Sequence, residues 1–121
     1  MRGRDLVRRR YAEAATLLRD GLAILEKKHP DDWSTFHTRS LLGGALVGQT
    51  KYAEAEPLLL MGYQGLKQRR DRIPASAKNS LTVALGRLVR LYDAWGKKDE
   101  AAKWRKEMEA MKASDQVEKE K

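Results

Sequence analysis

The segment Tyr11-Ala12-Glu13-Ala14 recurs as Tyr52-Ala53-Glu54-Ala55, 41 residues further along the chain. The match continues in register, because leucine and glycine positions downstream of each copy also align: Leu17, Leu18, Gly21 and Leu25 with Leu58, Leu59, Gly62 and Leu66. A weaker third copy reads Lys98-Asp99-Glu100-Ala101, with a lysine in place of the tyrosine. Self-similarity at a fixed period is the signature of repeat architectures, so the sequence predicts an array of similar units.

Each copy opens a segment whose apolar residues recur at spacings of three and four, the period of an amphipathic α-helix. In the first copy these residues are Tyr11, Ala14, Ala15, Leu18, Leu22 and Leu25. Two further helical stretches, residues 33–49 and 76–95, lie between the copies, and Gly96 is a helix-stop residue after the second. The chain is therefore predicted to be all-α, with about five helices joined by short polar turns.

The amino-acid composition excludes several classes of function. Of the 121 residues, 35% are charged and 41% hydrophobic, and none is cysteine, which removes disulfides, thiolate metal sites and thiol nucleophiles. No segment approaches the roughly 20 apolar residues that cross a bilayer, and residues 1–10 are basic without the apolar run of a signal peptide. We therefore expect a cytoplasmic protein without a membrane partner. Its net charge of +8 favours an acidic partner.

The chain resembles the tetratricopeptide repeats, in particular the subtype of kinesin light chains. The residues that carry the resemblance are Gly43, Leu46, Thr50, Tyr52 and Ala55 in the middle repeat, Val89, Tyr92, Gly96, Lys98 and Ala101 in the last, and the turn His29-Pro30-Asp31. Thr50 replaces the turn glycine, Leu46 the first-helix aromatic and Lys98 the second-helix tyrosine. The resemblance implies a right-handed α-solenoid of antiparallel helical hairpins that acts as a protein-interaction module or scaffold.

A second resemblance covers the C-terminal half. The segments Gly62-Tyr63-Gln64-Gly65-Leu66-Lys67, Arg72-Ile73-Pro74 and Arg90-Leu91-Tyr92-Asp93-Ala94-Trp95-Gly96-Lys97 are similar to the repeats C-terminal to bacterial serine/threonine protein kinases. This resemblance implies a regulatory sensor or docking tail that performs no chemistry itself. It stands as an alternative to an independent interaction module.

The predicted organisation is a basic leader at 1–10, a repeat domain at 11–113 and a charged tail at 114–121 that frays. The repeat domain divides into a leading helix at 11–29, a hairpin at 33–70 and a hairpin at 76–113. The leader is too short and too basic to give the leading helix a hairpin partner. Because repeat arrays need neighbours and polar caps, we expect that end to form a homodimer or to pack on another chain.

In the resembled family the ligand lies along the concave face made by the first helix of each hairpin. Carried over by position, the partner-binding residues are His37, Ser40, Gly44, Val47, Arg87, Arg90, Asp93 and Ala94. Arg87 and Arg90 are expected to form charge-assisted bonds to an acidic segment of a protein or peptide. We expect no enzyme activity, cofactor or metal.

The sequence offers three other candidate sites. Gly43–Thr50 has the spacing of a phosphate-binding loop, but Gln49 replaces its essential lysine and a helix precedes it. A metal site would draw on His29, Asp31, Asp32 and His37, which a capped inter-repeat turn explains as well. The basic clusters at 8–10 and 67–72, with Arg87 and Arg90, leave a nucleic-acid binder as a second alternative, although no recognisable nucleic-acid module accompanies them. Trp33, Trp104, Met108 and Met111 are expected in the core, and Trp95, next to the Gly96 turn, is expected to be partly exposed.

Overall fold

The computed structural model describes residues 2–120, and the prediction of an all-α chain with five helices is confirmed for this part of the protein. No strand occurs among these residues. The α-helices are α1 (Arg2–Lys28), α2 (Trp33–Gly48), α3 (Tyr52–Gln68), α4 (Ser80–Trp95) and α5 (Lys98–Glu120). Two short 3-10 helices, η1 (Arg70–Arg72) and η2 (Ala75–Ala77), occupy the connection between α3 and α4.

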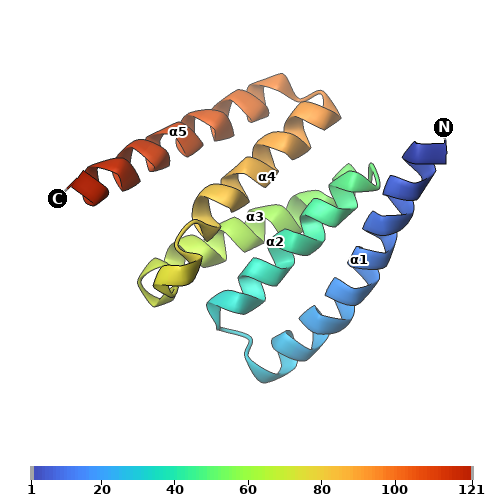
Figure 1. Cartoon of the computed structure of the whole chain (residues 1–121), viewed down its shortest axis with the longest axis horizontal. Coiled ribbons are helices and arrows are strands. Elements are labelled where there is room, and N and C mark those ends of the chain that lie inside the picture. Colours follow the sequence, from blue (N-terminus) through green and yellow to red (C-terminus); the bar gives the residue numbers. More distant parts are fainter. Residues whose placement is uncertain (1, 121) are drawn as a thin grey trace.

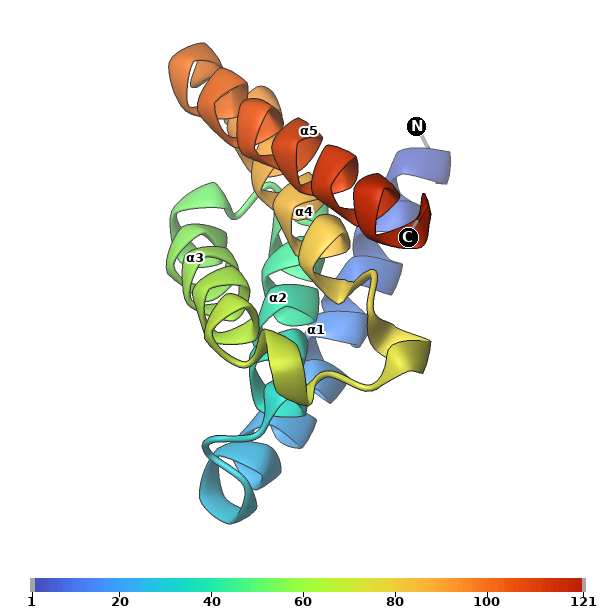
Figure 2. The ribbon, with the colours of Figure 1, turned by 90° about the vertical axis from the view of Figure 1, so that its left-hand side faces the viewer.

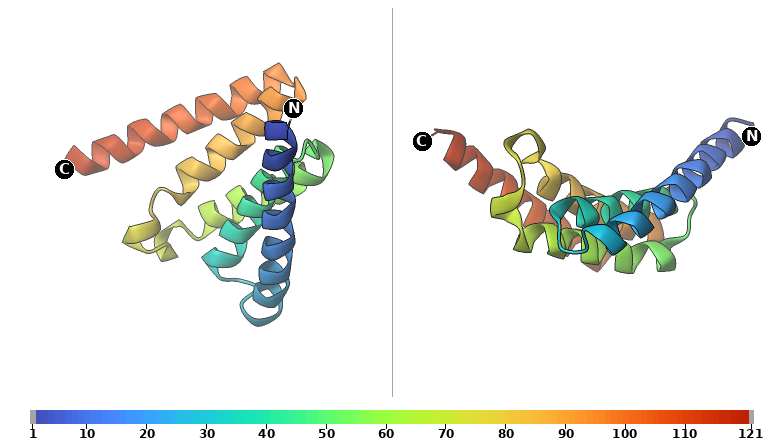
Figure 3. Two further views of the ribbon diagram at one scale, coloured as in Figure 1. Left: turned by 45° about the vertical axis from the view of Figure 1, so that its right-hand side comes forward. Right: turned by 90° about the horizontal axis from the view of Figure 1, so that it is seen from below.

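Consecutive helices run antiparallel and pack on one another (Figure 1). Helix α2 is central, because it contacts α1, α3 and α4, whereas α5 packs on α4. Figure 2 shows α2 between α1 and α3. In the view from below, the helices form an arch whose two ends are the N-terminal part of α1 and the C-terminal part of α5 (Figure 3).

The helix boundaries follow local chemistry. Asp32 caps α2, since its carboxylate accepts a hydrogen bond from the backbone N–H of Ser34 at 3.2 Å. Gly96 ends α4 in the left-handed region with a φ of 80°, as its helix-stop role predicts. Thr50 takes the corresponding turn position after α2 with a φ of 63°, a conformation that costs free energy for a residue with a Cβ.

Three expected boundaries differ from the structure. Residues 2–10 continue α1 and do not form a separate leader, because their five arginines have high helix propensity and charge is tolerated on a helix exposed to solvent. Residues 114–120 likewise belong to α5, although their composition predicts fraying. Helix α4 begins at Ser80, later than the expected residue 76, since residues 75–77 form η2.

The core lies where α2, α3 and α4 meet, with α5 closing one side. Its fully buried leucines are Leu46, Leu59, Leu66, Leu85, Leu88 and Leu91. Helices α2 and α3 cross closely at Gly62, where a Cβ atom would lie 2.9 Å from the carbonyl oxygen of Phe36. Trp104 is buried against Tyr63, with ring centroids 5.7 Å apart, which confirms the prediction that it belongs to the core.

Candidate functional site

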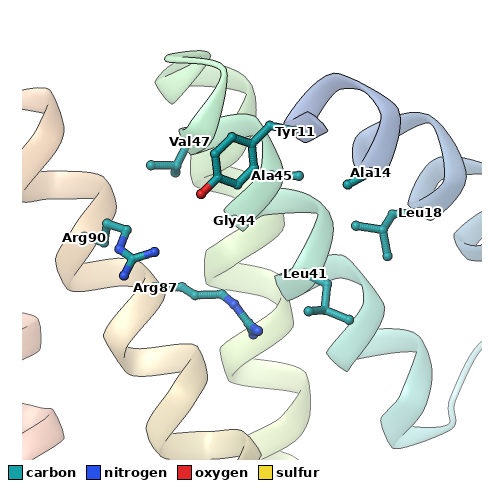
Figure 4. A pocket seen from close by; sticks show the side chains of 9 residues that line it. All are labelled: Tyr11, Ala14, Leu18, Leu41, Gly44, Ala45, Val47, Arg87 and Arg90. Carbon is teal, nitrogen blue, oxygen red and sulfur yellow. The ribbon is translucent and has the colours of Figure 1, made fainter. Parts of the chain in front are cut away.

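A cleft of about 270 Å³ opens between α1, α2 and α4 (Figure 4). Two of its walls are mainly apolar, and the third carries two guanidinium groups. The lining residues are Tyr11, Ala14 and Leu18 from α1, Leu41, Gly44, Ala45 and Val47 from α2, and Arg87 and Arg90 from α4. An apolar hollow beside a pair of cations can receive an apolar group and an anion at the same time.

Arg87 crosses from α4 to α2 beneath the cleft. Its Nη1 donates a hydrogen bond of 2.9 Å to the hydroxyl oxygen of Ser40, which is itself fully buried. The aliphatic stem runs past Gly44, where a Cβ atom would lie 3.3 Å from the Arg87 Cδ. Burial lowers the pKa of Arg87, and the positive charge of Arg90 lowers it further. The guanidinium is thus held in place by α2 and is partly desolvated.

Neither arginine of the cleft is neutralised within the described part of the chain. No ion pair joins Arg87 or Arg90 to a carboxylate, and Arg90 is exposed. Charge-assisted hydrogen bonds from guanidinium to carboxylate are stronger than those between neutral groups. The positive charge of the cleft is therefore available to bind an anionic group.

His37 lies one turn before Ser40 on α2, with its ring centroid 5.9 Å from that of Trp33. Its Nδ1 is buried and makes no hydrogen bond. Burial lowers the pKa of His37 below its ordinary value of 6.5, and the charge of Arg87 acts in the same direction. The imidazole is therefore neutral at physiological pH and adds no positive charge to the site.

The structure brings together six of the eight residues expected on the concave face. Gly44, Val47, Arg87 and Arg90 line the cleft, and Ser40 and His37 lie beside Arg87. The other two do not line it. Asp93 accepts a hydrogen bond of 2.7 Å from Arg105 of α5, which turns its carboxylate toward that helix, and Ala94 is exposed further along α4.

The sequence reasoning missed the contribution of α1. Tyr11, Ala14 and Leu18 form one wall of the cleft, yet their helical spacing was interpreted only as a packing stripe. Gly48 allows this arrangement, because a Cβ atom there would collide with the ring of Tyr11. Periodicity shows that a stripe is apolar, but it does not show whether part of the stripe stays open to solvent.

The basic cluster at 67–72 is largely engaged in contacts between helices. Arg69 is paired with the Asp31 carboxylate, donates to the Asp31 carbonyl oxygen at 2.7 Å and lies over the Phe36 ring, with its Cζ 4.1 Å from the centroid. Arg70 forms an ion pair of 3.1 Å with Asp115 of α5. These contacts hold α3 to its neighbours and leave few free cations in this cluster for a nucleic acid.

The remaining candidates are explained by local structure. The glycine-rich segment resembling a phosphate loop is the C-terminal part of α2 and the turn that follows it. Asp32 caps that helix, and Asp31 pairs with Arg69. Among residues 6–117, whose side chains the structure describes, no group of three or more histidine, cysteine or acidic side chains is arranged to hold a metal ion. No helix in this part of the chain combines the length and apolarity needed to span a bilayer.

Comparison of the chain with protein-family models, with curated proteins and with solved structures found no match.

Proposed function

We propose that this chain is a non-catalytic protein-interaction module whose cleft binds an acidic peptide segment of a partner. The observation that carries the proposal is the pair Arg87 and Arg90 beside an apolar hollow, neither of them paired with a carboxylate of the described residues. The cleft volume of about 270 Å³ is below the roughly 300–1,000 Å³ typical of small-molecule sites. This size favours one or two side chains of a peptide over a cofactor.

Arg87 and Arg90 have different roles in this proposal. Arg87 is positioned by its hydrogen bond to Ser40 and loses little side-chain freedom on binding, so it fixes the orientation of a carboxylate. Arg90 is exposed and adds long-range attraction, which raises the association rate more than the affinity. An apolar side chain of the peptide lies between Leu18 and Val47, where it displaces water from the apolar walls.

We further propose that the hairpins stack as a right-handed α-solenoid of the tetratricopeptide type. The support is the repetition of local features along the chain. Helix α2 and helix α4 each have 16 residues, and each is followed by a tight turn with one residue of positive φ, Thr50 or Gly96. A stack of this kind aligns the first helices of successive hairpins, and the cleft that α2 and α4 share supports it.

Selection from a displayed library of random peptides tests the proposal. We expect the selected peptides to share one large apolar residue flanked by aspartate or glutamate, with affinity that falls as salt rises. The variant Arg87→Gln/Arg90→Gln is expected to bind them about tenfold more weakly and with a flatter salt dependence. A matched control, Arg8→Gln/Arg9→Gln, removes the same charge from an exposed part of α1 and is expected to bind normally.

Two results would overturn the proposal. One is a selection without an acidic consensus, and the other is equal binding by the cleft variant and the control. Filter binding of single-stranded and double-stranded nucleic acid at near-physiological salt examines the rival function. Tight binding there, lost steeply as salt rises, would favour nucleic acid as the ligand.

A further inference from the structure

Helix α1 carries an exposed stripe on the side away from α2. The stripe consists of Glu13, Leu17, Gly21, Ile24 and Lys28, spaced by three or four residues along one face of the helix; Gly21 is half-buried and the other four are exposed. The side chains of Leu17 and Ile24 are 72% and 56% exposed, although both are large and apolar. In Figure 1 and Figure 3, α1 is the outermost helix at its end of the molecule, with α2 on one flank only.

The internal repeat identifies what this face lacks. Gly21 of α1 aligns with Gly62 of α3, where the backbone of α2 approaches so closely that a Cβ atom would lie 2.9 Å from the Ser40 nitrogen. At Gly21 the same Cβ atom would meet nothing within 4 Å. The face of α3 that packs on its hairpin partner therefore corresponds to a face of α1 that has a glycine ready for close approach and no helix against it.

The positions on either side of Gly21 in the stripe show the same difference between α1 and α3. Leu17 aligns with Leu58, which packs against the core, and Ile24 aligns with Gly65, which is buried beneath the ring of Phe36. In α3 both positions are covered by neighbouring helices, whereas in α1 both are open. Exposed apolar residues arranged on one helix face, unlike scattered ones, mark an interaction surface.

We propose that this stripe binds the same stripe of a second copy of the chain, with the two α1 helices antiparallel. The order of the stripe is acid, apolar, glycine, apolar, base, so an antiparallel copy is complementary to it at every position. Glu13 then lies opposite Lys28 of the second copy, Leu17 opposite Ile24, and the two Gly21 residues meet at the two-fold axis. A closed two-fold contact between identical surfaces is the commonest form of homo-oligomer.

Charge favours a second copy over an unrelated apolar helix. Glu13 and Lys28 are both exposed, and neither forms an ion pair within the described residues. In the antiparallel pairing, Glu13 of each copy lies opposite Lys28 of the other copy. The two-fold symmetry therefore gives two such ion pairs per dimer. An unrelated partner helix would not need an acid and a base at opposite ends of the stripe, one on each side of the glycine.

Sedimentation equilibrium of the full chain across the micromolar range tests the proposal. We expect the unaltered protein to form a dimer. Gly21→Glu places two carboxylates together at the two-fold axis and is expected to weaken dimerisation by about tenfold or more. The folded monomer accepts this change, because nothing lies within 4 Å of the added Cβ, and unaltered circular dichroism checks that it does.

Charge reversal tests the antiparallel register. Glu13→Lys and Lys28→Glu are each expected to weaken the dimer, because each places like charges together at two symmetric contacts. An equimolar mixture of the two variants restores complementary pairs at both contacts and is expected to form heterodimers. The controls Glu109→Lys and Lys106→Glu make the same charge changes on exposed positions of α5 and are expected to leave the dimer unaffected.

Three results would each overturn the proposal. The first is a monomer at every concentration tested, which would leave the stripe to a different partner. The second is a dimer that Gly21→Glu does not weaken, which would place the interface elsewhere. The third is a mixture of the charge-reversed variants that associates no better than either variant alone, which would exclude the antiparallel register.

Discussion

Alanine substitutions at Gly62 and Gly21 are expected to change stability in opposite directions, although the two glycines are equivalent in the repeat. Each substitution gains about 1 kcal/mol from the higher helix propensity of alanine. At Gly21 nothing opposes this gain, because the added Cβ has no neighbour within 4 Å. At Gly62 the Cβ would lie 2.9 Å from backbone atoms of Phe36 and Ser40, which cannot rotate away as a side chain can.

The cost at Gly62 is an overpacking cost, because α2 and α3 must move apart along a buried contact. Such strain costs about 1–3 kcal/mol. After the propensity gain, Gly62→Ala is expected to lower the free energy of unfolding by about 1 kcal/mol, and Gly21→Ala to raise it by about 1 kcal/mol. With a urea m-value of about 2 kcal/mol/M, the two unfolding midpoints differ by about 1 M.

Urea unfolding followed by circular dichroism measures this difference, at protein concentrations low enough to keep the chain monomeric. Gly86→Ala on α4 is a matched control, since its Cβ would lie 3.8 Å from the Met108 sulfur, an ordinary contact. It is expected to behave like Gly21→Ala. If Gly62→Ala stabilises the protein as much as the control does, the close crossing of α2 and α3 is refuted.

Three further predictions concern turns, protonation and a buried hydrogen bond. Thr50→Gly is expected to raise the free energy of unfolding by about 1 kcal/mol, because it relieves a positive φ of 63°. Gly96→Ala is expected to lower the free energy of unfolding by a similar amount, because it puts a Cβ at a positive φ. Thermal unfolding compares the two variants. The pKa of His37 is lower in the folded protein than its ordinary 6.5, so the unfolded state binds more protons as the pH falls. Stability is therefore expected to decline below pH 6.5 and to level off once the pH is below the folded-state pKa, and His37→Gln should remove this part of the pH dependence in urea titrations. Tyr92→Phe removes a hydrogen bond of 2.7 Å from the phenol to Glu56, and a loss of about 1–2 kcal/mol is expected in the same assay; no loss would show that water replaces the tyrosine hydroxyl without cost.

Most of the fold could be predicted from the sequence, because local patterns determine most of it. Apolar spacing placed the five helices, Asp32 and Gly96 marked a helix start and a helix end, and Trp104 was assigned to the core. The extent of α1 was not predicted. Residues 6–10 are exposed, and periodicity detects a helix through the side that it buries.

The candidate site was predicted less completely, because its shape depends on how helices cross. Gly44, Val47, Arg87 and Arg90 were expected to share a face, and they line one cleft. Asp93 was expected beside them but pairs with Arg105, a residue 12 positions later whose location depends on the angle between α4 and α5. The angle between two helices cannot be derived from the spacing of residues within one of them.

The position of Arg69 has a consequence for how the protein opens. From the end of α3 this side chain reaches Asp31 in the turn between α1 and α2, and its guanidinium also lies on Phe36 of α2. The first helix pair cannot swing away from α3 without breaking these contacts together. Backbone amides of α2 and α3 should therefore exchange with deuterium at similar slow rates, as one cooperative unit, while those at the far end of α5 exchange ahead of them.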